Sequence, residues 1–222
     1  NPANALGAGQ HFGDVDSDIE YTGSAIPDSD GNQLGNMVYE GYFKYALMDK
    51  ESMKLPYYVG TYMGKKKMLN VGLGFFAQPN GTYDTLKAEH DNVLHFAGDV
   101  FFDHPLKGGA VNAYASVQSF NYGENYMSRW AGTGTTYYAQ FGYYTEKLKM
   151  MPYVSYQYAQ YDGLNDDPSA LNLGVNYFIN GHHAKITAEY MGIYNNILEG
   201  GNDASGNPQN MEQIRLQLHI FL

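Results

Sequence analysis

The stretch 171–194 constrains the fold more than any other, because apolar and polar residues alternate on both sides of an Asn-Gly pair. Alternation with period two places the apolar residues on one face of a strand. Asn180-Gly181 is the dipeptide most typical of a tight β-hairpin turn. Each arm has about ten residues, enough at ~3.3 Å per residue to cross a bilayer when tilted. The apolar face would carry Leu171, Leu173, Val175, Tyr177, Ile179, Ala184, Ile186, Ala188 and Tyr190.

The same alternation recurs along most of the chain. We expect strands near 38–47, 69–76, 94–103, 110–119, 137–145, 151–160, 171–180, 184–194 and 211–222. Long connections alternate with short ones, 49–67 being a long exception on the side of the short turns. Outer-membrane barrels sort their connections in this way, with short turns in the periplasm. The sequence therefore predicts an all-β fold, an antiparallel transmembrane β-barrel, over 37–222.

The composition fits a sheet with one apolar and one wet face. The chain has 22 Tyr, 11 Phe and 26 Gly, whereas a soluble core would be rich in Leu, Ile and Val. No apolar run of about 18 residues exists, so a transmembrane helix is excluded. The net charge of −10 makes nucleic acid an unfavourable partner. The absence of cysteine is compatible with an oxidising envelope.

Residues 1–36 are rich in Gly, Asp, Asn and Ser and lack sustained periodicity. We interpret them as an extracellular loop or disordered segment. Within them, 14–20 begins like an EF-hand calcium loop, but Ile19 and Ala25 stand where that loop needs Gly and Glu. A solvated acidic loop is the favoured interpretation, and a weak, irregular calcium site is the alternative.

The polar face of the strands would line a lumen. Its charged members, with Glu146 in a turn, comprise three basic and five acidic residues, so the lining is slightly acidic. The residues expected to line the pore are Glu40, Lys44, His95, Asp99, Asp103, Gln118, Gln140, Asn176, Lys185, Glu189 and Arg215.

No catalytic or metal site is predicted, and no cofactor. His95 and Asp99 are four positions apart, hence ~13 Å along one strand, too far for a dyad. His182 and His183 lack a third nearby ligand and are interpreted as part of a solvated turn. The lysine run 65–67 is likewise interpreted as a solvated turn at a membrane edge.

Two segments resemble a known family. Residues 60–72, GTYMGKKKMLNVG, and 174–178, GVNYF, followed by GHHAK at 181–185, resemble the C-terminal half of the phosphate-selective porin O and P family, of the Bacteroidetes type. The resemblance covers roughly 37–222 and implies a trimeric porin of about sixteen strands. Phosphate selectivity in that family depends on laddered arginines, and this chain has only Arg129 and Arg215. We therefore assign no phosphate site.

The sequence is compatible with two functions. The first is a passive outer-membrane channel for small hydrophilic solutes or ions. The second is a structural or scaffold barrel within a larger envelope complex, favoured by bulky inward residues such as Tyr138 and Phe178. A soluble lipocalin-like barrel is less suitable, because Arg215 and Gln217 would line its apolar cavity.

The strand count leads to an expectation about partners. Nine strands are an odd number, whereas single-chain bacterial barrels have an even one. We expect further strands, an N-terminal half of the same barrel or its equivalent, to pair with both edges. The other expected partners are the lipid bilayer and, in a homotrimer or a larger complex, other outer-membrane proteins.

Overall fold

All regular structure in the described part of the chain is β. The computed structural model describes residues 37–51, 59–84, 89–126, 132–196 and 209–220. Within these ranges, nine strands form one antiparallel sheet, and no helix is long and apolar enough to cross a membrane. Residues 1–36, with the calcium-like stretch 14–20, and Arg129 lie outside the described residues.

The strands pair in chain order, so each is joined to the next as a hairpin. This meander is the simplest way to build an antiparallel sheet from consecutive alternating segments. The strands are β1 (Tyr39–Ala46), β2 (Met68–Asp84), β3 (Glu89–Leu106), β4 (Gly109–Asn121), β5 (Gly134–Thr145), β6 (Met150–Tyr161), β7 (Ser169–Asn180), β8 (Ala184–Asn196) and β9 (Gln209–Ile220).

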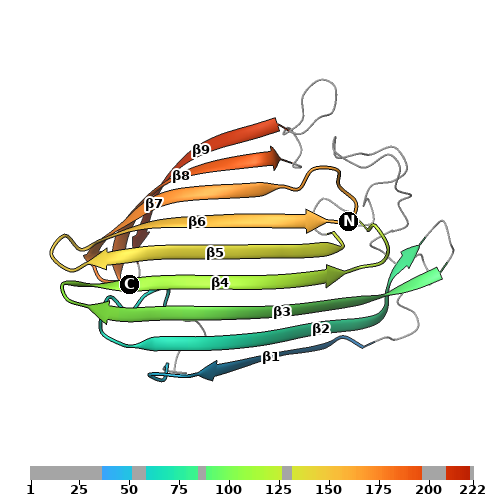
Figure 1. The fold of residues 1–222 in the computed structure, drawn as a ribbon, viewed down its shortest axis with the longest axis horizontal. Coiled ribbons are helices and arrows are strands. Elements are labelled where there is room, and N and C mark those ends of the chain that lie inside the picture. Colours follow the sequence, from blue (N-terminus) through green and yellow to red (C-terminus); the bar gives the residue numbers. More distant parts are fainter. Residues whose placement is uncertain (1–36, 52–58, 85–88, 127–131, 197–208, 221–222) are drawn as a thin grey trace.

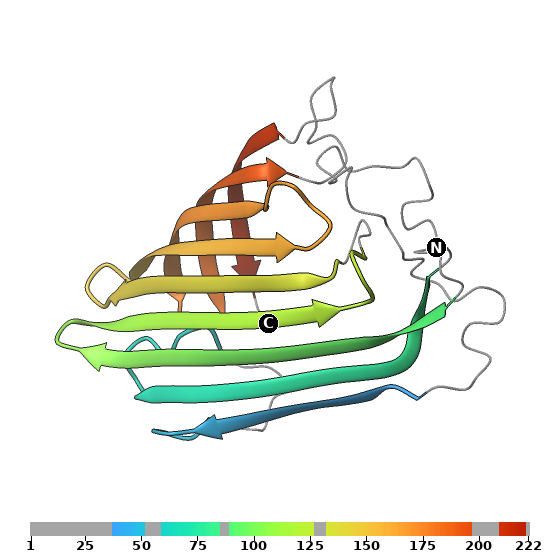
Figure 2. The same ribbon diagram turned by 45° about the vertical axis from the view of Figure 1, so that its right-hand side comes forward.

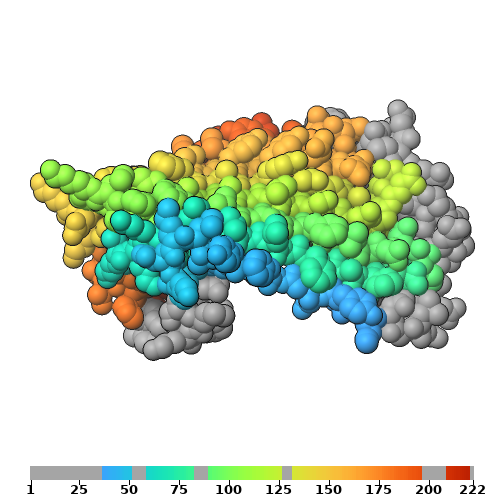
Figure 3. Space-filling model, turned by 60° about the horizontal axis from the view of Figure 1, so that its bottom comes forward, coloured from blue at the N-terminus to red at the C-terminus, as the bar shows by residue number. Residues whose placement is uncertain are grey.

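The sheet is strongly curved and is not closed. Figures 1 and 2 show β7, β8 and β9 curling behind the front strands, so that the sheet forms a trough. Among the described strands, β1 pairs only with β2 and β9 only with β8. Figure 3 shows the blue β1 at the rim of the molecule, on this open edge.

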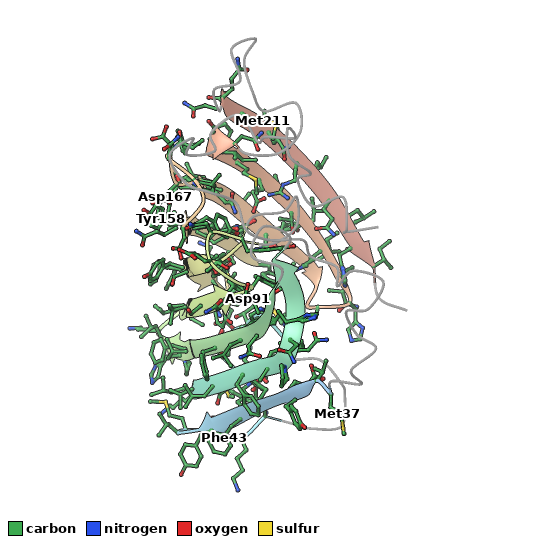
Figure 4. All side chains as sticks on the ribbon, turned by 90° about the vertical axis from the view of Figure 1, so that its right-hand side faces the viewer. Met37, Phe43, Asp91, Tyr158, Asp167 and Met211 are labelled. Atoms are coloured by element: carbon green, nitrogen blue, oxygen red, sulfur yellow. The ribbon has the colours of Figure 1, made fainter. Side chains whose placement is uncertain are left out.

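The two faces of the sheet differ in chemistry. The register keeps the alternation in phase from strand to strand, with Leu73 opposite Gly98 and Gly98 opposite Val117. The apolar residues lie on the outer, convex face, where Phe43 and Tyr158 are seen in Figure 4. Many stay exposed, among them Leu73, Phe96, Phe141, Leu173, Tyr177, Ile214, Leu216 and Leu218. No described segment covers this face.

The hairpin predicted at 171–194 is present, and its residues lie on the predicted faces. Tyr177 pairs with Ile186 and Asn176 with Thr187, so each pair shares the predicted face. The turn is longer than two residues, because β7 ends at Asn180 and β8 begins at Ala184. Gly181 has a φ of 53°, a left-handed conformation that favours glycine.

The connection between the strands predicted near 69–76 and 94–103 is shorter than the polar loop expected at 78–92. β2 continues to Asp84 and β3 begins at Glu89, past an irregularity between Gln78 and Thr82. At this irregularity Asn80 adopts a φ of 50°, and its N–H donates to Asn92 Oδ1 at 3.0 Å. Backbone pairing does not require apolar side chains, so strands can extend beyond the alternating region.

Candidate pore lining

The residues predicted to line a lumen share the inner, concave face of the sheet. The register places Lys44 opposite Gly72 and Gly72 opposite Asp99, and it places Glu189 opposite Arg215. The same parity places the remaining members on this face: Glu40, His95, Asp103, Gln118, Gln140, Asn176 and Lys185.

An ion pair joins the inner faces of β8 and β9. Arg215 Nη2 lies 2.6 Å from Glu189 Oε1, and the Tyr153 hydroxyl donates to Glu189 Oε2 at 2.5 Å. The Tyr153 ring covers Gly174, where an added Cβ would lie 2.4 Å from the ring. A glycine on β7 thus lets the ring reach across to the carboxylate on β8.

A second charged cluster lies between β1 and β2. Lys44 pairs with Glu51, whose carboxylate also accepts hydrogen bonds from Tyr62 Oη at 2.7 Å and Asn70 Nδ2 at 2.8 Å. Glu51 therefore connects β1 and β2 to the segment that joins them.

His95 lies among aromatic rings rather than beside a carboxylate. Its ring stacks on Phe76 at 5.1 Å and meets Phe120 and Tyr122 edge-on at 5.1 and 4.6 Å. Asp99 instead accepts a hydrogen bond from Tyr42 at 2.8 Å. The geometry contains no His95–Asp99 dyad.

Residues 59–67, here called the strap, cross the inner face at the end of the sheet that carries the short turns. Thr61 Oγ1 donates to Asp103 Oδ2 at 2.7 Å, and the Tyr62 N–H donates to the same oxygen at 3.2 Å. Asn112 Nδ2 donates to that oxygen at 3.0 Å and to Gly60 O at 2.8 Å. Asp103 is 0 % exposed, so its carboxylate holds the strap and does not face open solvent.

The strap reaches as far as the turn between β7 and β8. His182 Nε2 lies 2.7 Å from Thr61 O, and since a carbonyl can only accept, this nitrogen carries the proton. Met63 packs against a cluster of buried side chains from β4 to β7, formed by Ala110, Tyr144, Met151 and Phe178. The strap therefore narrows the trough from within.

Sequence reasoning missed the strap. The segment 49–67 and the turn at His182 were both interpreted as solvated, whereas Thr61 is 2 % exposed and His182 is partly buried. The available signal was length, because 49–67 was the one long connection on the side of the short turns. Length alone did not show that the segment folds inward.

Charge is unevenly distributed between the two ends of the sheet. The described lysines gather near the turn end: Lys44, Lys50, Lys65, Lys66, Lys67, Lys107, Lys147, Lys149 and Lys185. Acidic residues are numerous at the loop end: Asp91, Glu124, Asp162, Asp166, Asp167 and Glu212. The turn end of the sheet therefore has a positive electrostatic potential, and the loop end has a negative one.

Within the described ranges, no three His, Asp or Glu side chains come close enough to hold a metal ion. The inner face instead presents hydroxyls, amides and compensated charges.

Comparisons of the chain with models of known protein families, with curated proteins and with solved structures found no match.

Replacing Asp103 should loosen the strap. Asp103→Ala removes the acceptor of three hydrogen bonds, and one bond to a charged group contributes ~1.5–3 kcal/mol. The strap should then open roughly 10- to 100-fold more often, and trypsin should cleave after Lys65–Lys67 correspondingly faster. Asp99→Ala is the control, since its partner Tyr42 is on β1. Equal cleavage of both variants would show that Asp103 does not hold the strap.

Acid should destabilise the folded state through His182, because the folded state buries its imidazole. Burial lowers the pKa of His182 from its ordinary 6.5, and nearby Lys185, Lys65 and His183 lower it further, against the raising effect of the Thr61 carbonyl. The native state therefore favours neutral imidazole, and the stabilisation is complete above pH 6.5 and declines as the pH falls below it.

The measurement is thermal unfolding between pH ~7.5 and ~5, compared with His182→Gln, which keeps a donor without titrating. The melting temperature of the wild type should fall more steeply. Parallel curves would mean that His182 is not responsible.

Proposed function

We propose that this chain forms the wall of an outer-membrane channel for the passive passage of small hydrophilic solutes or ions. The observation that carries the proposal is the contrast between an exposed apolar outer face and a polar inner face across all nine strands. Lipid is the solvent in which such an outer face is stable. The proposed location is the bacterial outer membrane.

The open edges support a barrel completed by further strands. Each unpaired backbone N–H or C=O group of β1 and β9 would cost on the order of several kcal/mol in hydrocarbon, because lipid offers it no hydrogen-bond partner. We infer that strands from an N-terminal half of the barrel, or their equivalent, pair with both edges. The resemblance to phosphate-selective porins O and P agrees with such a barrel, of about sixteen strands, and with a homotrimer or assembly with other outer-membrane proteins.

We infer neither phosphate selectivity nor catalysis. Arg215 is the one arginine on the described inner face, and Glu189 pairs with it. Lys44 is paired with Glu51. The lysine-rich turn end and the acidic loop end oppose each other. These features support a pore without strong preference for anions.

A scaffold barrel within an envelope complex is the second candidate. The strap favours it, because Met63 and the buried side chains beneath it fill part of the trough. The two candidates differ in whether the lumen conducts.

Conductance and selectivity test the proposal together. The complete barrel in a planar bilayer should give discrete conductance steps, and a salt gradient should give a reversal potential near zero. Absence of steps would favour the scaffold barrel. A strongly anion-selective potential would overturn the inference drawn from the charges.

Introducing a charged side chain on the outer face should lower the free energy of unfolding. Val175→Lys or Leu216→Lys should cost ~2–4 kcal/mol of unfolding free energy in lipid vesicles if the position is near mid-membrane. Gln217→Lys, one residue from Leu216 on the inner face and exposed, is the matched control and should cost far less. Denaturant titration in vesicles measures both. Equal costs would mean that the outer face does not meet lipid.

A further inference from the structure

A cavity of about 310 Å³ lies between the strap and the inner face of β5 to β9. Gly60 and Thr61 of the strap form one wall. Its volume is at the lower end of the ~300–1,000 Å³ typical of small-molecule sites. The cavity therefore has room for a solute of about the size of one sugar ring.

The lining is dominated by neutral groups that form hydrogen bonds. Amides from three strands meet hydroxyls from others, and the residues that matter most to the argument are Gln140, Tyr153, Asn172, Asn176, Thr187 and Gln217. Amides and hydroxyls both donate and accept. A ligand with hydroxyl groups can satisfy them in several orientations, whereas an apolar ligand would leave them unpaired.

Charge in the cavity is small. Lys185 and Glu189 are the lining lysine and carboxylate, and Glu189 is compensated by Arg215 at 2.6 Å. Burial lowers the pKa of His182, so its imidazole is neutral at pH 7. One lysine remains, and a single ammonium can donate to a neutral oxygen as well as to an anion.

Some polar groups of the lining already have partners, which leaves others directed to a ligand. The Thr187 hydroxyl donates to Asn176 Oδ1 at 2.6 Å, so the Asn176 NH₂ group remains a donor. Asn172 is 5 % exposed, and its Nδ2 donates to Ser155 Oγ at 3.1 Å. Asn172 Oδ1 is buried and has no partner among the described residues. A buried acceptor without a donor is unfavourable, so the hydrogen bonding of the lining is incomplete.

Aromatic rings give the cavity an apolar surface beside its polar groups. Tyr138 and Tyr153 line the same cavity and present flat apolar surfaces next to the amides. A sugar ring has the matching combination, an apolar C–H face with hydroxyls around its edge. Phosphates and carboxylates lack that face.

We propose that this cavity is a low-affinity subsite for small, uncharged polyhydroxylated solutes such as monosaccharides. The inference rests on the proposed channel, since it names the class of solute that the same lumen takes. Affinity is low because a solute that passes through must also leave.

Saturation-transfer NMR on the complete barrel in detergent tests the site independently of conductance. Glucose is the probe, with gluconate and glucosamine as charged comparators of similar size. Glucose should give the strongest transfer. Asn176→Ala, which removes the NH₂ donor, should weaken its binding about 3- to 10-fold, the range for one lost hydrogen bond.

Gln157→Ala is the matched control, because Gln157 is an inner-face amide on β6 outside the cavity. Gln217→Ala, on β9, repeats the test on a second strand of the cavity wall. Transfer to gluconate as strong as to glucose, or equal binding by the cavity and control variants, would overturn the subsite. Conductance without glucose binding refutes the subsite alone. Glucose binding without conductance refutes the channel and leaves the site.

Discussion

One constraint governs this structure: a sheet nine strands wide carries an apolar face with no described layer upon it. A water-exposed face of this kind is unfavourable, since apolar surface contributes about 25 cal/mol per Å² when removed from water. Ile214 and Leu216 are 87 % and 78 % exposed. Either a second protein surface or lipid must cover such a face. The exposed residues follow every strand, and for this reason we propose lipid, a continuous solvent, rather than a local partner.

The inner face follows from that constraint. Because alternate residues of a strand point to opposite faces, the polar residues that the apolar outer face excludes lie on the inner face. The chain uses these positions in two ways. Near the turn end, Asp103 and Asn112 hold the strap, and the apolar cluster under Met63 adds to it. Farther from the turn end, Glu189 on β8 and Arg215 on β9 form an ion pair in which their charges compensate each other. The polar face is thus an organised surface with its own packing.

Much of the fold could be predicted from the sequence. Alternation locates the strands and their faces because it reflects a purely local geometry. The Asn-Gly pair located the turn at 180–181, but not its length or the pairing across it. Polarity misplaced the 78–92 connection, since strand pairing is a backbone property. The strap could not be predicted, because its anchors, Asp103 and His182, are far from Thr61 in sequence. Inward folding depends on these long-range hydrogen bonds, which no local pattern encodes.

The strap also determines how a channel of this kind could discriminate. Long-range fields contribute little, because the basic turn end opposes the acidic loop end and Glu189 cancels Arg215 at their contact. Short-range interactions then decide, and they are strongest where the passage is narrowest. In the described part of the chain the strap narrows the trough, and there Thr61 faces amides and hydroxyls from the opposite wall. In the proposed subsite, a neutral solute replaces part of its hydration with these groups. In the proposed channel, selection by hydrogen bonding therefore follows from the position of one segment whose anchoring side chains, Thr61 and Asp103, are buried.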